Sequence, residues 1–411
     1  MISLCMIVRD EAATLARALE SAQGAVGEIV VVDTGSVDDT VAIAQSYGAK
    51  VFHFDWANDF AAARNESLRQ ATGDWVLVLD ADEVLLPPAV ELLKNLDQGQ
   101  PLGQVAAADV LALNLLRLEL GAPQTPYTLI TRLFRRQPEI TFNRPYHETV
   151  DESIAALQRQ APRWRVVTLT DVAIHHTGYD PAVVVQRGKF DRARTTMEGY
   201  LADHPDDAYL LNKLAALYVE SDQADQALPL IDRALDQADK LDQLTRYELH
   251  YHRALALADC PTAAASDYET ALAEPIPPVL KLGAWVNYGS LKKNEGDLEG
   301  AIALFEQAIA ADPTLALAHY NLGATHRARG YLDEAIAAYR QAIALAPNYP
   351  EAHQNLGVAL FKLGKMPEAL QSFRRAIDLY DTVNPPAAAD LRQGVNKLGL
   401  PASLMVQAGL M

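Results

Sequence analysis

Two carboxylates one residue apart carry the clearest chemical signal in the sequence. Asp80 and Asp82 directly follow the apolar run Trp75–Leu79, which is typical of a buried strand. Both carboxylates can face one divalent cation there, and hard oxygen ligands suit Mg²⁺ or Mn²⁺, ions that usually bind substrate phosphates as well. The alternative is a turn with solvated acids, which an isolated Asp-x-Asp triplet would favour. The position after a strand favours a metal site.

The elements that would position this pair alternate between strand and helix. Four apolar runs are separated by three helix-like segments, the runs at 2–8, 28–33, 49–54 and 75–79 and the helices at 11–21, 38–47 and 59–70. This alternation is typical of a parallel sheet covered by helices, in which ligands bind beyond the carboxyl ends of the strands. Those ends all carry charged or polar groups: Arg9-Asp10-Glu11, Asp33, Asp55-Trp56 and Asp80-Ala81-Asp82. We therefore expect a site at this edge of an α/β domain.

Several motifs over the first 190 residues or so resemble, in family order, a nucleotide-sugar glycosyltransferase of family 2 with the GT-A fold. They are Ile2–Glu11, Val31–Thr40 and Asp80–Glu83. Asp55-Trp56 and the stretch Asn58–Asn65 resemble a subgroup, the bacterial lipopolysaccharide-core β-glucosyltransferases and peptide S-glycosyltransferases. Asp10 departs from the subgroup, which usually has Asn there, whereas Glu11 is retained. The resemblance implies a Rossmann-like amino-terminal domain that transfers a sugar, with inversion, from a nucleotide-diphosphate donor.

The resemblance also implies roles for residues on the donor side. Asp33 would hold the nucleoside, since a carboxylate at a strand end can accept from a base N–H or a ribose hydroxyl, although it could instead cap a helix. Asp80 and Asp82 would bind the donor. Arg64, one helical turn into its helix, could bind a diphosphate bidentately; the alternative is an ordinary surface salt bridge. Asn65 could hydrogen-bond a sugar hydroxyl.

Two further motifs belong to the carboxyl-terminal half of this region. Phe142–Glu148 resembles the subgroup's acceptor-side motif, which makes Glu148 the candidate catalytic base, although the sequence leaves Asp109, Glu119 and Asp151 open. His175–Tyr179 resembles the His-x-Gly-Tyr signature and places His176 at the metal position beside Asp82. A neutral imidazole with carboxylates is a plausible Mn²⁺ set. The alternative for His176 is a structural histidine.

A 34-residue period dominates the second half of the chain. Gly289, Gly323 and Gly357 are 34 residues apart, and alanines and aromatic residues follow them at constant offsets. This helix–turn–helix period resembles the tetratricopeptide repeat (TPR), and five units fit between residues 208 and 383. Asparagines two residues before each glycine, Asn287, Asn321 and Asn355, would form a ladder that binds a partner's backbone. The alternative is that they brace neighbouring helices.

The motifs define the expected organisation of the chain. We expect a GT-A domain over 1–180, a connecting helix and linker over 181–207, an all-α solenoid of five repeats over 208–383, and a capping helix and tail over 384–411. Asp180 and Pro181 would begin the connecting helix. The solenoid has 23 acidic against 15 basic residues, which favours a neutral-to-basic protein partner.

The amino-acid composition excludes some classes of function and indicates where the protein is located. Lysine and arginine total 35 against 53 aspartate and glutamate, a net charge of −18, which argues against nucleic-acid binding. Two cysteines and no apolar stretch of 18 residues indicate a cytoplasmic protein without a transmembrane segment, located there or at the inner membrane face through partners. The predicted function is transfer to a protein, peptide or glycolipid acceptor. The alternatives are a TPR scaffold with an inactive transferase domain and, ranked last, a kinase or nucleotidyl transferase.

Overall fold

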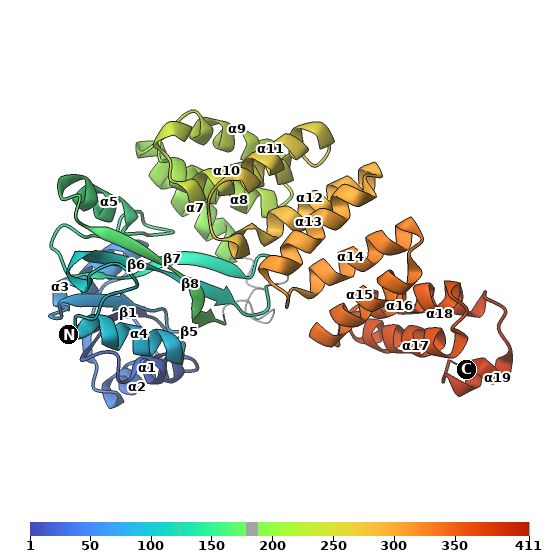
Figure 1. The fold of residues 1–411 in the computed structure, drawn as a ribbon. Coiled ribbons are helices and arrows are strands. Elements are labelled where there is room, and N and C mark those ends of the chain that lie inside the picture. Colours follow the sequence, from blue (N-terminus) through green and yellow to red (C-terminus); the bar gives the residue numbers. More distant parts are fainter. Residues whose placement is uncertain (123, 178–187, 411) are drawn as a thin grey trace. The chain divides into compact units, whose positions relative to one another are not determined.

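The computed structural model describes residues 1–122, 124–177 and 188–410. Two compact units divide the chain, Met1–Ala256 and Leu257–Met411, and each is described by itself (Figure 1). The first unit contains a mixed β-sheet followed by helices, and the second is entirely helical. The architecture is therefore an α/β Rossmann-like domain followed by an all-α solenoid, as the sequence predicts.

One mixed sheet forms the centre of the first unit, and its described strands run in the order β3-β2-β1-β4-β7-β6-β8-β5. The four strands expected from the sequence, β1 to β4, pair in parallel. Beyond β4 the neighbours β7 and β6 are antiparallel, and β5 pairs antiparallel with β8. The strand bounds are Ile2–Val8, Glu28–Asp33, Lys50–His53, Trp75–Val78, Glu83–Leu85, Val110–Glu119, Tyr127–Arg135 and Arg165–His176 for β1 to β8.

Helices cover both faces of this sheet because the central strands are apolar on both sides. Alternate residues of β1 point to opposite cores: Leu4 and Met6 pack with α1, α2 and α4, whereas Cys5 packs with α3 and α5. The carboxyl ends of the parallel strands therefore remain uncovered for a site. The helices are α1 Leu15–Ala22, α2 Thr40–Ser46, α3 Phe60–Gln70, α4 Pro87–Asp97, η1 Ala107–Asp109 and α5 Asp151–Gln160.

Four further helices complete the first unit. Met197 and Leu201 pack against Leu211 and Leu214 in a core that also takes up Tyr146 from the sheet domain. Asp180 and Pro181, the expected start of the connecting helix, lie outside the described residues. The helices are α7 Gly188–Asp203, α8 Ala208–Glu220, α9 Ala224–Leu235, η2 Ala238–Lys240 and α10 Gln243–Ala256. The contact boundary after Ala256 thus keeps α8, α9 and α10 of the repeat region in one unit with the sheet. The boundaries expected near 180 and 207 remain predictions.

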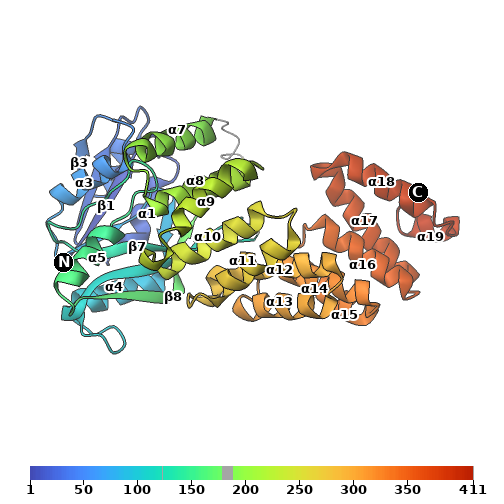
Figure 2. The same cartoon turned by 90° about the horizontal axis from the view of Figure 1, so that it is seen from above.

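The second unit is a run of paired helices that follow one another as an array (Figure 2). Each repeat glycine lies against an aromatic ring: a Cβ built on Gly323 would come within 2.8 Å of the Tyr339 ring. The aromatic residue therefore fills the space that the missing side chain leaves. The helices are α11 Pro261–Ala273, η3 Pro278–Lys281, α12 Leu282–Glu295, α13 Leu298–Ala311, α14 Ala316–Arg329, α15 Leu332–Leu345, α16 Pro350–Lys362, α17 Met366–Val383, α18 Pro385–Asn396 and α19 Ala402–Gln407.

The last helices close the array. Ala388 of α18 packs against Ala376 and Tyr380 of α17, as a capping helix would. The short helix α19 was not expected from the sequence. Across the described part of the chain, no helix combines the length and apolar character needed to cross a membrane.

Candidate functional site

The antiparallel pairing of β5 with β8 brings Asp82 close to His176. Glu83 lies opposite His176 in this register, so Asp82, one residue earlier, reaches the same imidazole. The Nε2 atom of His176 lies 3.1 Å from Oδ2 of Asp82, and Nδ1 is hydrogen-bonded to the buried carboxylate of Glu119. Two residues that are 94 positions apart in sequence therefore meet, as the metal hypothesis requires.

The surroundings of His176 orient its imidazole. Burial opposes the charged form, but the hydrogen bonds to Asp82 and Glu119 outweigh it and raise the pKa of His176 to about 9. An imidazole whose Nδ1 is held by a carboxylate presents Nε2 in a fixed direction, as metal-bound histidines commonly do. Within the described ranges, no three His, Cys, Asp or Glu side chains gather into a group able to hold a metal ion. The protein thus provides two candidate metal ligands here, Asp82 and His176.

Asp80 has different partners from Asp82, which corrects the expectation that both carboxylates face one cation. Its two oxygens bind the guanidinium groups of Arg64 and Arg132, the latter at 2.5 Å. Although burial opposes ionisation, Arg132 and Arg64 hold the pKa of the Asp80 carboxyl far below its usual range. Both carboxylates are about a third exposed, but Asp80 is paired with two arginines, whereas Asp82 contacts His176 and is the carboxylate better placed for a ligand.

The network continues from Asp80 through the sheet to His176. Arg132 also reaches the fully buried Glu83 at 2.9 Å, and Arg117 joins Glu83 at 2.7 Å to Glu119 at 2.6 Å. Acidic and basic groups alternate along the whole chain of contacts, which runs Glu148, Arg64, Asp80, Arg132, Glu83, Arg117, Glu119, His176 and Asp82. It links the candidate base to the candidate metal ligands.

Sequence reasoning missed two members of this network, Arg117 and Arg132. Both lie among apolar residues within strands, in Leu115–Leu118 and next to Leu133 and Phe134. A charged residue inside a buried strand requires a buried partner, and that signal could have marked them. Glu119, left open as a base by the sequence, is committed to His176 and Arg117 instead.

Arg64 and Asn65, the residues expected to contact the diphosphate and the sugar, both bind other groups of the protein. Arg64 has a side chain only 4% exposed, and its Nε donates to Glu148 at 3.0 Å while its Nη2 binds Asp80. It therefore pairs with both carboxylates, and its contact with a diphosphate remains a prediction. Asn65 donates to and accepts from the backbone of Phe142, at 2.9 and 2.8 Å. Both ends of its amide thus hold this segment, and its contact with a sugar hydroxyl remains a prediction.

Asp33 lies at the end of β2, as expected, and shapes the turn that follows. Its carboxylate accepts from the backbone N–H groups of Gly35 and Ser36 and lies 3.1 Å from Nδ1 of His53. These contacts lower the pKa of Asp33 despite its burial. Its contact with a nucleoside remains a prediction.

Glu148 lies beside Asp80 through their shared partner Arg64. Arg64 holds the Oε1 atom of Glu148, and the side chain is 14% exposed. Asp151, another base left open by the sequence, accepts from the hydroxyls of Thr131 and Thr149 near the start of α5. The geometry thus favours Glu148 over Asp151 and Glu119 as the carboxylate next to the acidic pair.

The asparagine ladder of the second unit is more enclosed than a peptide-binding surface would be. Asn321 is only 8% exposed, and Asn355 donates to the Tyr320 hydroxyl at 2.9 Å. These contacts favour the bracing alternative for both residues; Asn287 is half-buried. Partner binding through the ladder remains a prediction.

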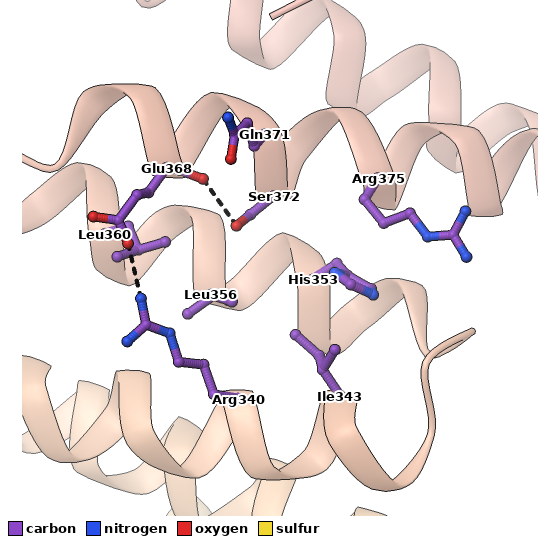
Figure 3. Close-up of a pocket in the computed structure, with 9 residues that line it drawn as sticks. All are labelled: Arg340, Ile343, His353, Leu356, Leu360, Glu368, Gln371, Ser372 and Arg375. Atoms are coloured by element: carbon purple, nitrogen blue, oxygen red, sulfur yellow. Dashed lines mark hydrogen bonds and ion pairs between the residues drawn. The ribbon is translucent and has the colours of Figure 1, made fainter.

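A separate cavity of about 330 Å³ lies between α15, α16 and α17 of the second unit. Figure 3 shows Arg340 paired with Glu368 at its edge, at 2.8 Å, over an apolar floor. The floor is formed by Ile343, Leu356 and Leu360, and none of the three ladder asparagines lines the cavity. The ladder and the cavity are therefore distinct features of the repeats.

Comparison with known proteins agrees with the fold. Residues 3–110 match the model of glycosyl transferase family 2, and residues 184–247, 289–328, 325–364 and 350–382 match TPR models. The fold and site thus define a family 2 glycosyltransferase domain followed by TPR repeats. The chain belongs to the same family as a TPR repeat-containing protein of Synechococcus elongatus, to which it is 46% identical over 76% of each chain.

More distant relatives match a smaller share of the chain. An uncharacterized glycosyltransferase of Rickettsia felis is 27% identical over 46% of this chain and 66% of its own length. The glycosyltransferase SunS of Bacillus subtilis is 25% identical over 62% of this chain and 57% of its own. Among solved structures, the TPR protein YrrB matches 49% of this chain and all of its own at 18% identity, with a TM-score of 0.39, too low to support an argument.

Proposed function

We propose that the chain is an inverting, metal-dependent glycosyltransferase that moves a sugar from a nucleotide-diphosphate donor to a protein, peptide or glycolipid acceptor. The observation that carries the proposal is the meeting of Asp82 with His176, whose Nδ1 is held by Glu119. A carboxylate and an imidazole suit Mn²⁺ or Mg²⁺ when oxygens of the diphosphate and water complete the coordination. The matches to family 2 support the reaction class.

The proposed roles follow the demands of the reaction. The metal, when bound, neutralises charge that develops on the leaving nucleoside diphosphate. Asp82 and His176 would hold it, and Glu148 would take the proton from the acceptor nucleophile. Arg64 orients Glu148 through the contact at 3.0 Å, and Asp33 would hold the nucleoside. The repeats would bind the acceptor or a partner protein.

Donor hydrolysis tests the proposal directly. Purified protein is incubated with a panel of nucleotide sugars, with Mn²⁺, with Mg²⁺ and with EDTA, and release of nucleoside diphosphate is measured. We expect turnover of at least one donor that requires the metal and is lost in Asp82→Ala. Glu148→Gln, which keeps shape but removes basicity, should bind donor normally and lose transfer.

The competing function is a TPR scaffold that carries an inactive transferase domain. The buried network of ion pairs around Asp80 argues against the scaffold function, because such networks cost free energy to desolvate and are then expected to serve a function. If no nucleotide sugar on the panel binds or turns over with either metal, while the repeats still bind a protein partner, the scaffold function replaces the transferase.

A further inference from the structure

The segment Phe142–Glu148, which ends at the proposed catalytic base, is fastened to α3 at two points. Asn65 holds the backbone of Phe142 by two hydrogen bonds, and the backbone N–H of Phe60 donates to the carbonyl oxygen of Pro145 at 3.0 Å. These bonds fix the beginning and the middle of the segment against the sheet domain. Arg144 lies between these two points, and its side chain contacts a different part of the chain.

Arg144 joins this segment to the first helix of the repeat region. Its side chain is 3% exposed, and Nε donates to Oδ2 of Asp207 at 2.6 Å. Its guanidinium also pairs with Glu152 and lies 4.7 Å from the ring centre of Tyr209 on α8. A charge-assisted bond between buried partners is among the stronger interactions available, so α8 and the segment are coupled.

Asp207 has a second function that explains its fixed position. Its other carboxylate oxygen, Oδ1, accepts from the backbone N–H of Leu210 at 3.0 Å and so caps the start of α8. The residue is 11% exposed. One carboxylate therefore begins the first repeat helix and anchors Arg144.

The backbone of the segment needs such an anchor. Arg144 has φ +73° and His147 has φ +54°, both in the left-handed region, which costs a residue with a side chain on the order of 1 kcal/mol or more. Such conformations persist only when surrounding contacts impose them. The contacts of Arg144 with α5 and with the start of α8 impose this backbone conformation at Arg144, a short distance along the chain before Glu148.

We propose that Asp207 is a positioning residue for Glu148: by holding Arg144, it fixes the segment 142–148 and with it the carboxylate that meets the acceptor. The inference rests on the proposed function of Glu148. It makes the first repeat helix part of the catalytic unit, in addition to any role in binding acceptors. Arg144 transmits the effect and touches neither Asp82 nor His176.

The variant Asp207→Asn separates the helix cap that Asp207 provides from its ion pair with Arg144. Asparagine caps helices as well as aspartate does, but it lacks the charge that holds Arg144. Asp297→Asn is the matched control, since Asp297 caps α13 through Gly300 at 2.9 Å and pairs with Lys292 at 3.5 Å in the second unit. We expect Asp207→Asn to lower the kcat of transfer about tenfold, as small displacements of catalytic groups do. Binding of the nucleoside diphosphate with Mn²⁺, measured by calorimetry, should change less than twofold, and Asp297→Asn should change neither.

Hydrogen exchange provides a measurement that does not depend on activity. Backbone amides over residues 141–150 should exchange faster in Asp207→Asn than in the wild type or in Asp297→Asn. Arg144→Gln should give the same pattern, and the double variant should lose no more kcat than the worse single variant. Unchanged exchange with wild-type kcat in Asp207→Asn, or additive losses, would overturn the inference. A wild type without transfer would instead refute the proposed function, while the exchange data still decide whether Asp207 fixes the segment.

Discussion

Asp80 and Asp82 lie one residue apart but have opposite surroundings. Asp80 pairs with two almost buried arginines, Arg64 and Arg132, whereas Asp82, which is equally exposed, contacts His176. Chemically identical side chains thus serve different purposes, because their neighbours differ. The contrast yields a test that separates structural from catalytic carboxylates.

Asp80→Asn and Asp82→Asn should affect different properties. Asp80→Asn leaves Arg64 and Arg132 without their shared carboxylate. Because Asp80 is 31% exposed, the free energy of unfolding should fall by roughly 2 kcal/mol, less than the 3–5 kcal/mol typical of fully buried pairs. Asp82→Asn loses only a partly exposed contact with His176, so its free energy of unfolding should fall less than that of Asp80→Asn, whereas its metal-dependent turnover should be lost. Urea denaturation and donor hydrolysis measure the two effects; equal destabilisation by both variants would contradict the division of roles.

The two cysteines should differ in reactivity. Burial raises the pKa of the Cys5 thiol to about 12, and its Sγ contacts the carbonyl oxygen of Ser67, whereas Cys260 is exposed. The thiolate is the reactive form, so a disulfide reagent such as DTNB at pH 8 should label one thiol per native chain and two in guanidinium chloride. Cys260→Ser should abolish the rapid native reaction. Rapid labelling of that variant would show that β1 opens readily.

At the scale of elements, each repeat glycine packs against an aromatic ring that leaves no room for a side chain. A Cβ on Gly289, Gly323 or Gly357 would lie within 2.8 Å of an aromatic ring of the following helix, from Phe305, Tyr339 or Phe373. Close packing of paired helices therefore selects glycine at these sites. This explains the 34-residue period physically, as a repeated contact.

Gly323→Ala should destabilise the second unit. The added methyl group meets the buried Tyr339 ring, and overpacking of this kind costs about 1–3 kcal/mol. Gly394→Ala in α18 is the control, because its Cβ would meet nothing within 4 Å and alanine favours the helix by about 1 kcal/mol. Thermal unfolding followed by circular dichroism should show opposite shifts for the two variants. A neutral Gly323→Ala would mean that the ring can move aside.

At the scale of the whole molecule, the contacts group the first helices of the repeat region with the sheet, in the unit Met1–Ala256. Buried residues of α7 pack on those of α8, and Asp207 anchors Arg144. A boundary drawn where the repeat pattern begins would cut through this core. The compact unit is therefore larger than the family 2 domain alone.

Truncation tests this boundary. A fragment of residues 1–256 should fold cooperatively and hydrolyse donor like the full chain. A fragment of residues 1–205 loses α8 and Asp207, so its melting temperature should be lower by about 10 °C, corresponding to a few kcal/mol for a domain of this size. Circular dichroism compares the two. Equal melting temperatures would place the boundary of the catalytic unit before the repeats.

Local patterns in the sequence determined a large part of this structure. The apolar runs predicted β1 to β4, and the glycine period predicted the repeats, because strand alternation and helix pairing depend on residues close in sequence. The motifs also singled out Asp82, His176 and Glu148. The contacts of Arg64 and Asn65 within the protein were not predicted, since their partners Glu148 and Phe142 lie 84 and 77 residues away.

Only the tertiary structure decided which charges meet. Arg132 lies on β7, whose pairing with β4 brings it to Asp80, and Arg117 lies on β6, which the strand order β6-β8-β5 brings to Glu83. Such pairings join segments far apart in the chain, and no local pattern encodes them. The sequence thus determined the residue types at the edge of the sheet. The long-range register determined that Asp80 is held by arginines and that Asp82 is left for a ligand.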